Sequence, residues 1–140
     1  MGASENKQQS LKMYQSQAAG DHQGFLDCCD EDITITVPGS QDLLPWRVHV
    51  KGRNNIPEFF AFMGKYITID KVEMKQLVAD GDKVVIFLHE YLTVVENKFS
   101  FELDEVHVHT HKDGKIVDIS MFEDTATVVA AVRGKKVQDL

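Results

Sequence analysis

The chain has 140 residues, of which 43% are apolar and 26% charged, and its formal net charge at pH 7 is −7. This length matches one ordinary domain, so we predict a single domain over residues 1–140, with a core at about 10–130 and a loose tail at 134–140. An acidic chain without a basic stripe is repelled by nucleic acid and by anionic membrane surfaces, which excludes both as partners.

The cysteines and the first residues indicate a compartment. Cys28 and Cys29 are adjacent, and because a disulfide between neighbours is strained, we predict reduced thiols that pack as small apolar side chains. The start, MGASENKQQS, lacks the apolar core of a signal peptide. No stretch reaches the roughly 18 apolar residues that a membrane-spanning helix needs. These features predict a cytoplasmic protein.

Two helices and a strand are predicted first. Gly20 ends a helix over residues 4–19, and Asp21 is positioned to cap a second helix that reaches about residue 29. Isoleucine and threonine alternate over residues 33–37, which is typical of a strand, and Pro38-Gly39 ends it. The apolar stripe of the first helix is predicted to consist of Leu11, Tyr14 and Ala18.

A loop and a third helix follow. Residues 40–47 contain the only tryptophan, Trp46, and are predicted to form a loop. Asn54 or Asn55 is positioned to cap the next helix, whose first turn tolerates Pro57. The buried stripe of that helix is predicted to consist of Ile56, Phe59, Phe60 and Met63.

The remaining chain is predicted to form a four-stranded antiparallel meander. Asp-Gly is a strong hairpin signal because both central residues of a type I′ turn need positive φ. The strands are predicted to end at Ala79 and to run over 84–95, 99–111 and 115–122, with turns at 80–82, 96–98 and 113–114. Asp124 or Thr125 is positioned to cap a last helix through Val132. Helices followed by a long, bent meander indicate an α+β fold with a concavity at its open end.

The densest polar cluster lies on the third strand of the meander. Alternation places Glu105, His107, His109 and His111 on one face. His107 beside Glu105 is suited to proton transfer with a pKa close to neutral, and a half-buried structural histidine fits the pattern equally well. Zinc takes at least three protein ligands, and His111 is predicted to lie in solvent next to the turn. We therefore predict no metal and no cofactor.

Other residues are candidates for the pocket wall. Tyr14 could point its phenol at a substrate oxygen, although core packing is the commoner arrangement for such a tyrosine. Trp46 is a candidate wall or lid, with core or dimer packing as the alternative. Glu90 interrupts an apolar run, where a carboxylate needs solvent or a partner. We assign His107, Glu105 and Tyr14 to catalysis and Trp46, His109, Glu90 and Met121 to ligand binding.

Several phrases of the sequence, in their order and spacing, resemble the SnoaL-like branch of the nuclear transport factor 2-like superfamily, which also contains ketosteroid isomerase. They are Ala19-Gly20-Asp21, Asp30 to Gly39, Leu44-Pro45-Trp46 with Lys51-Gly52-Arg53, Ala79 to Val85, His107 to Ile116 and Phe122 to Ala126. The resemblance implies a cone-shaped α+β barrel: a strongly bent, mostly antiparallel sheet around N-terminal helices, with an internal apolar pocket. It also implies a homodimer formed through the outer face of the sheet.

The resemblance does not imply one activity, since relatives include isomerases, cyclases, dehydratases, epoxide hydrolases and non-catalytic binders. Ketosteroid isomerases carry a tyrosine in the first helix, an aspartate before the proline of the first strand and an acid in the third long strand. The counterparts here are Met13 or Tyr14, Val37 and His107. Val37 stands where those enzymes place their base, which argues against steroid isomerisation by that arrangement.

Two functions are open on the sequence. The first is a cofactor-free isomerase, cyclase or dehydratase in which His107, tuned by Glu105, moves a proton on a small apolar carbonyl compound. The second is a module that binds a small apolar molecule in the same pocket without turnover. The sequence has no glycine-rich phosphate loop, nucleophile elbow or dinucleotide fingerprint, which argues against nucleotide and covalent chemistry.

Overall fold

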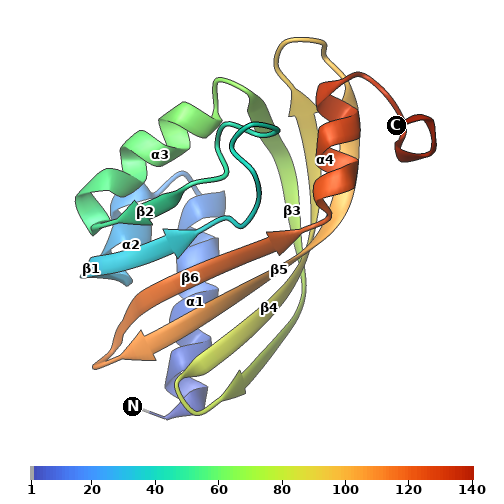
Figure 1. Cartoon of the computed structure of the whole chain (residues 1–140). Helices are drawn as coiled ribbons and strands as arrows, with labels where there is room; N and C mark the ends of the chain where they lie inside the picture. The colour runs from blue at the N-terminus through green and yellow to red at the C-terminus, as the bar shows by residue number, and fades with distance from the viewer. Residues whose placement is uncertain (1) are drawn as a thin grey trace.

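The computed structural model describes residues 2–140 as four helices and one six-stranded sheet (Figure 1). The helices are α1 (Ala3–Ala18), α2 (His22–Asp27), α3 (Ile56–Met63) and α4 (Thr125–Val132), with 3-10 turns at Arg53–Asn55 and Val137–Asp139. The strands are β1 (Cys29–Thr36), β2 (His49–Lys51), β3 (Ile67–Asp80), β4 (Lys83–Val94), β5 (Ser100–Lys112) and β6 (Lys115–Glu123). Within residues 2–140, no helix is long and apolar enough to cross a membrane.

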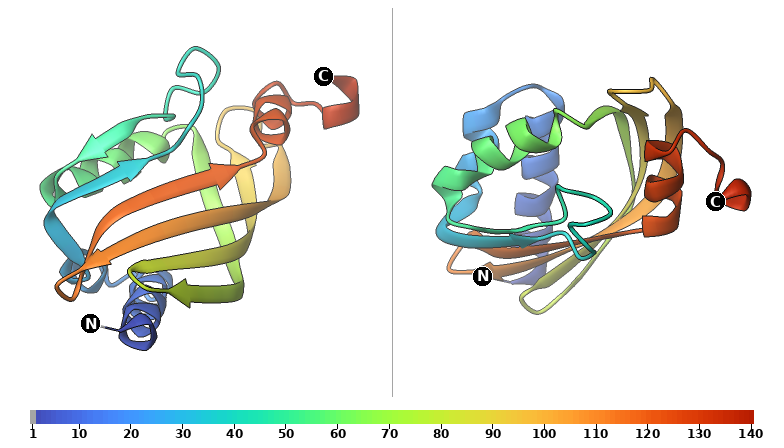
Figure 2. Two further views of the ribbon diagram at one scale, coloured as in Figure 1. Left: turned by 60° about the horizontal axis from the view of Figure 1, so that its bottom comes forward. Right: turned by 45° about the horizontal axis from the view of Figure 1, so that its top comes forward.

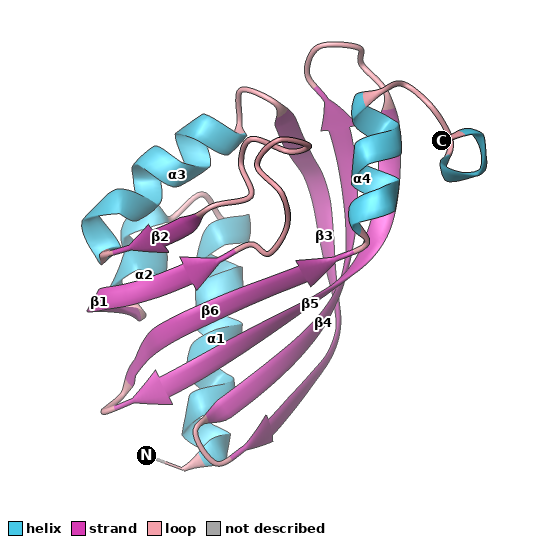
Figure 3. Ribbon diagram, viewed as in Figure 1, coloured by secondary structure: helices cyan, strands magenta, loops and turns pink. Residues whose placement is uncertain are grey.

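The sheet has the strand order β2-β1-β6-β5-β4-β3. Strands β3 to β6 form the predicted antiparallel meander, whereas β1 pairs parallel to β6 and antiparallel to β2. The sheet bends around α1, with α2 and α3 on the same side (Figures 2 and 3). This arrangement confirms the predicted cone-shaped α+β barrel. Strand β2 was not predicted because three residues are too few to show an alternation.

Local sequence signals explain the turns and the helix ends. Asp113 and Gly114 have φ values of 50° and 79°, the positive values that a type I′ turn requires. The Asp21 side chain accepts a hydrogen bond from the backbone of Gly24 at the start of α2, and Asp124 caps α4 in the same way. Asn55 precedes α3 without a side-chain capping bond. The predicted caps at Asp21 and Asp124 are therefore confirmed.

The buried face of α1 differs from the prediction. Leu11 is half-buried and Ala18 exposed, whereas the buried residues are Asn6, Ser10, Met13 and Tyr14. Two polar side chains can face the sheet because they find partners there: Asn6 donates to the Gly81 carbonyl, and Ser10 bonds to two histidines of β5. A search for apolar periodicity cannot detect such a stripe.

Two apolar clusters flank the concave face. One joins α1, α2 and α3 to the strands, and it includes Phe25, Ile35 and the buried, free Cys29. The other includes Trp46, Leu92 and, from α4, Val128. Cys28 is also free and buried, so both thiols pack as predicted.

Candidate functional site

Strand register places the ionisable residues of the concave face in rows. One row across β4, β5 and β6 contains Leu88, Glu105 and Glu123, the next contains Ile86, His107 and Met121, and a third contains Val84, His109 and Ile119. Glu105, His107, His109 and His111 are all buried, which confirms the predicted face of β5. The register adds Glu123, which the sequence did not identify.

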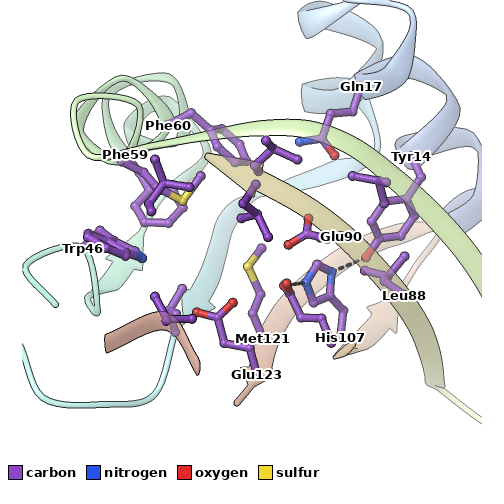
Figure 4. Close-up of a pocket in the computed structure, with 18 of the residues that line it drawn as sticks. Tyr14, Gln17, Trp46, Phe59, Phe60, Leu88, Glu90, His107, Met121 and Glu123 are labelled. Atoms are coloured by element: carbon purple, nitrogen blue, oxygen red, sulfur yellow. Dashed lines mark hydrogen bonds and ion pairs between the residues drawn. The ribbon is translucent and has the colours of Figure 1, made fainter. Parts of the chain in front are cut away.

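A pocket lies over the first two rows, between the sheet, α1 and α3 (Figure 4). Its free space is about 60 Å³, which is room for a few water molecules. The walls are mainly apolar and include Phe59, Phe60, Leu92 and Phe101. The polar lining residues are Tyr14, Gln17, Glu90, Glu105, His107 and Glu123. An apolar pocket with a few convergent polar groups is the usual form of a small-molecule site.

The three residues assigned to catalysis are in direct contact. Tyr14 Oη lies 2.6 Å from His107 Nδ1, and His107 Nε2 is hydrogen-bonded to Glu105 Oε1. Tyr14 comes from α1, and Glu105 and His107 are alternate residues of β5. Both ring nitrogens of His107 are therefore engaged by protein groups, and its side chain lies between the tyrosine and the carboxyl group (Figure 4).

Burial shifts the pKa values of Glu105 and His107 in opposite directions. Because desolvation disfavours the imidazolium, burial lowers the pKa of His107 to about 4. The prediction of a near-neutral pKa for His107 is therefore wrong. Burial, together with the nearby Glu123 carboxyl, raises the pKa of Glu105 to about 7. Glu105, not His107, changes its charge around neutral pH.

Glu90 is a second buried carboxyl group with a perturbed pKa. It faces the pocket from β4 and is 6% exposed. Burial and the adjacent Glu105 carboxyl raise the pKa of Glu90 to about 9, so it is a neutral acid at pH 7. A protonated carboxyl group is a hydrogen-bond donor.

Stability is expected to depend on pH through Glu90. Its pKa is higher in the folded chain, at about 9, than its ordinary value of 4.5, so the folded state retains a proton that the unfolded state releases. The free energy of unfolding should therefore fall by about 2 to 3 kcal/mol between pH 7 and 9. In Glu90→Gln this fall should largely disappear in urea titrations. Glu73→Gln, at a half-buried carboxylate whose pKa is lowered rather than raised, is the control and should keep the wild-type slope. A Glu90→Gln slope equal to wild type would contradict the assignment.

Arg47 and Glu123 form an ion pair that the sequence did not predict. Arg47 Nη2 lies 2.5 Å from Glu123 Oε1, and Arg47 Nη1 donates to the Pro38 carbonyl at 2.6 Å. Burial raises the pKa of Glu123, and the Arg47 guanidinium opposes this shift. Alternation from Met121 could have placed Glu123 on the pocket face. Arg47 lies in an aperiodic loop, so no pattern could have identified it.

Three carboxyl groups are the residues that a metal could use. Glu90, Glu105 and Glu123 offer oxygen atoms that lie within 4.8 Å of one another. Arg47 already places a cation against Glu123, and burial raises the pKa values of Glu90 and Glu105 to about 9 and 7, which favours bound protons on those two groups. The absence of a metal and a cofactor stays a prediction.

The other assigned residues divide between the pocket and the interior. Trp46 and Met121 line the pocket, as Glu90 does. His109 is fully buried behind Tyr14 and does not line the pocket. His111 is only 4% exposed, so its predicted place in solvent is wrong. Residues Gln9 and Ser10 of α1 cover it and bond to its two ring nitrogens.

Comparison with known proteins gives consistent matches. A family model described as a SnoaL-like domain matches residues 11–119. An NTF2-like protein of unknown function from Burkholderia pseudomallei is 21% identical, with a TM-score of 0.85 over 91% of this chain and 97% of that one. None of the curated proteins compared with the chain matches it.

Two further solved structures have the same fold. TerC, crystallised with polyporic acid, is 22% identical with a TM-score of 0.78, over 92% of this chain and 98% of its own. A protein from a Silicibacter species, provisionally described as a polyketide cyclase, is 17% identical with a TM-score of 0.72, over 94% and 97% of the two chains. At these identities the similarity establishes the fold alone.

Proposed function

Because the chain belongs to the SnoaL-like domain family, we propose that it is a cofactor-free isomerase, cyclase or dehydratase that transfers a proton on a small apolar carbonyl compound. Two carboxyl groups on the wall of an apolar pocket carry this proposal: Glu90, neutral at pH 7, and Glu105, whose pKa is about 7. Titratable groups whose environments separate their pKa values are typical of acid–base sites. The provisional description of one structural relative as a polyketide cyclase agrees with this reaction class.

The two carboxyl groups have different roles in the proposed reaction. Glu105, partly ionised at pH 7, takes the proton from the carbon next to the carbonyl group and returns it elsewhere on the product. Neutral Glu90 donates a hydrogen bond to the carbonyl oxygen, which becomes negatively charged as the proton leaves. Apolar walls strengthen both interactions because they exclude water. His107, neutral and bonded on both nitrogens, supports Glu105.

Deuterium exchange into a simple ketone tests the proposal. In D₂O, the protein should accelerate the exchange of hydrogen for deuterium at the carbons beside the carbonyl group of 2-tetralone. Proton NMR measures the rate of this exchange. The rate should rise through about pH 7, as Glu105 ionises, and fall near pH 9, as Glu90 loses its proton. Glu102→Gln, at an exposed carboxylate on the outer face of β5, should keep this profile. Bound 2-tetralone that does not exchange at any pH would favour the binding module instead.

We also propose that a second copy of the chain covers the outer face of the sheet. Phe87, Val106 and Phe122 are paired across β4, β5 and β6 on that face, and Phe87 and Phe122 are 39% and 49% exposed. Val78, Val85 and Val108 form a second paired row beside them. Burying such a patch against its own copy removes apolar surface from water.

The outer-face proposal predicts a change of oligomeric state. Light scattering after size exclusion should give twice the chain mass for the wild type, and the single-chain mass for Phe87→Asp with Phe122→Asp. Both substituted side chains are exposed and do not line the pocket, so the variant should remain folded. Val137→Asp, which alters an exposed apolar residue in the C-terminal turn, is the control and should stay dimeric. A monomeric wild type would overturn the proposal.

A further inference from the structure

One continuous chain of hydrogen bonds leads away from the pocket beneath α1. Its order is Glu105, His107, Tyr14, His109, Ser10, His111 and Gln9. Tyr14 Oη lies 3.0 Å from His109 Nε2, and Ser10 Oγ lies 2.8 Å from His109 Nδ1. Ser10 Oγ also lies 3.0 Å from His111 Nε2. His111 Nδ1 lies 3.0 Å from Gln9 Oε1. Six hydrogen bonds thus join seven side chains.

The hydrogen-bond chain forms because α1 and β5 run alongside each other and their polar side chains recur at similar distances. Ser10 and Tyr14 are four residues apart on α1, which is about 6 Å along a helix. Histidines 107, 109 and 111 are two residues apart on β5, which is about 6.6 Å along a strand. Each hydroxyl of α1 therefore lies between two imidazoles of β5.

The far end of the chain fixes the direction of its bonds. The Gly114 carbonyl can only accept, so the Gln9 atom that bonds to it is the amide nitrogen. The Gln9 oxygen then faces His111 Nδ1, which must donate. A neutral imidazole has one N–H, so His111 Nε2 accepts from Ser10. Ser10 Oγ, having donated its proton, accepts from His109 Nδ1, so His109 Nε2 accepts from the Tyr14 hydroxyl. Tyr14 Oη in turn accepts from His107 Nδ1, which leaves His107 Nε2 as an acceptor toward Glu105.

Counting protons identifies the donor at the pocket end. His107, Tyr14, His109, Ser10 and His111 each have one proton to donate when neutral, and the five protons all point toward Gln9. The sixth bond, between His107 Nε2 and Glu105, needs a proton from Glu105 itself. A protonated Glu105 therefore completes every bond, whereas an ionised Glu105 leaves one of the six without a proton.

We propose that this chain holds the proton on Glu105 and keeps His107 in the tautomer with its proton on Nδ1, which makes Gln9, Ser10, His109 and His111 positioning residues for the pocket carboxyl group. Only the catalytic meaning of that proton rests on the proposed function. The three histidines are neutral at pH 7, because burial lowers each of their pKa values. This agrees with one proton on each ring.

Other charged groups also act on this chain. Glu90 of β4, Glu123 of β6 and Arg47 of the loop between β1 and β2 surround Glu105, and Asp82 lies near His111. None of them is altered by a change at Ser10 or Gln9. A shift in the pKa of Glu105 in such variants can therefore be attributed to the hydrogen-bond chain.

Breaking the chain at Ser10 tests the proposal without a substrate. At about pH 6, ¹⁵N NMR of the wild type should show His107, His109 and His111 with the proton on Nδ1. In Ser10→Ala the remaining bonds can reverse and donate to an ionised Glu105, so its pKa should fall by about one unit in ¹³C carboxyl titrations. At pH 7 His107 should then carry its proton on Nε2. Thr36→Val, which removes a hydroxyl bonded to the exposed His49, is the control and should change neither reading.

Reversing the chain at Gln9 is the second test. The side chain at position 9 is half-buried, and a lysine there could only donate to His111 Nδ1. Gln9→Lys should therefore move the protons of all three histidines to Nε2 and lower the pKa of Glu105. An Nε2 proton on His107 in the wild type at about pH 6, or an unchanged Glu105 titration in both variants, would overturn the proposal. Both readings are independent of turnover, so a failure of ketone exchange would contradict only the proposed function.

Discussion

Glu105→Gln is expected to lower the rate of deuterium exchange into 2-tetralone by about 100- to 10,000-fold at pH 8. Glutamine keeps the size and polarity of the side chain but cannot take a proton, so ketone binding should remain. The pH dependence near pH 7 should disappear with the carboxyl group. Exchange is measured by proton NMR, and binding by titration of the ketone signals in the same samples.

Two further variants make this first prediction specific. Glu105→Asp keeps the carboxyl group one methylene further from the substrate, and it should recover part of the rate. His107→Phe should change the apparent pKa of the reaction more than its maximum rate, because His107 bonds to Glu105 and acts through it. If His107→Phe abolished exchange while Glu105→Gln retained it, the original assignment of the proton transfer to His107 would be correct.

Arg47→Leu is expected to reduce the free energy of unfolding by about 3 to 5 kcal/mol at pH 7. Arg47 is 3% exposed, and its guanidinium lies 2.5 Å from the Glu123 carboxylate. The leucine would leave Glu123, whose side chain is only 11% exposed, without its cation, beside Glu90 and Glu105. Burying an unpaired charge costs far more than an exposed pair contributes. Urea unfolding followed by circular dichroism measures the loss.

A double variant separates the ion pair from simple packing. Adding Glu123→Gln to Arg47→Leu removes the unpaired charge and should recover a large part of the stability, as a coupling between neighbouring sites. Arg53→Leu, at a half-buried arginine with one bond to the Cys29 carbonyl, should cost only about 1 kcal/mol. Additive effects of Arg47→Leu and Glu123→Gln would show that the pair does not stabilise the fold as proposed.

The local features of the fold could be predicted because they depend on neighbouring residues. The turns at Gly81 and Gly114 require positive φ, and both have it. Asp21 and Asp124 cap helices through backbone groups two or three residues away. The face of β5 follows from strict alternation. Each of these signals is complete within a short segment.

The predictions failed where the environment of a residue depends on a segment that is distant in the sequence. His111 lies beside a hairpin turn in the sequence, but α1 covers it, so its exposure could not be predicted from β5 alone. Ser10 was overlooked because a buried serine is stable only when it is bonded, and its partners are about a hundred residues away. The low pKa of His107 likewise depends on complete burial in the folded chain.

By itself, the sequence determined the order of the elements, their turns and caps, the family resemblance and the face on which Glu105 and His107 lie. Only the tertiary structure decided which groups meet: strand register brings Glu123 beside Glu105, and the loop after Pro38 brings Arg47 to Glu123. Residues of α1 cover the histidines of β5, and burial together with the Glu123 carboxyl raises the pKa of Glu105 to about 7. The physical reason is that proton affinity depends on desolvation and on charges from other elements, and neither exists before the chain folds.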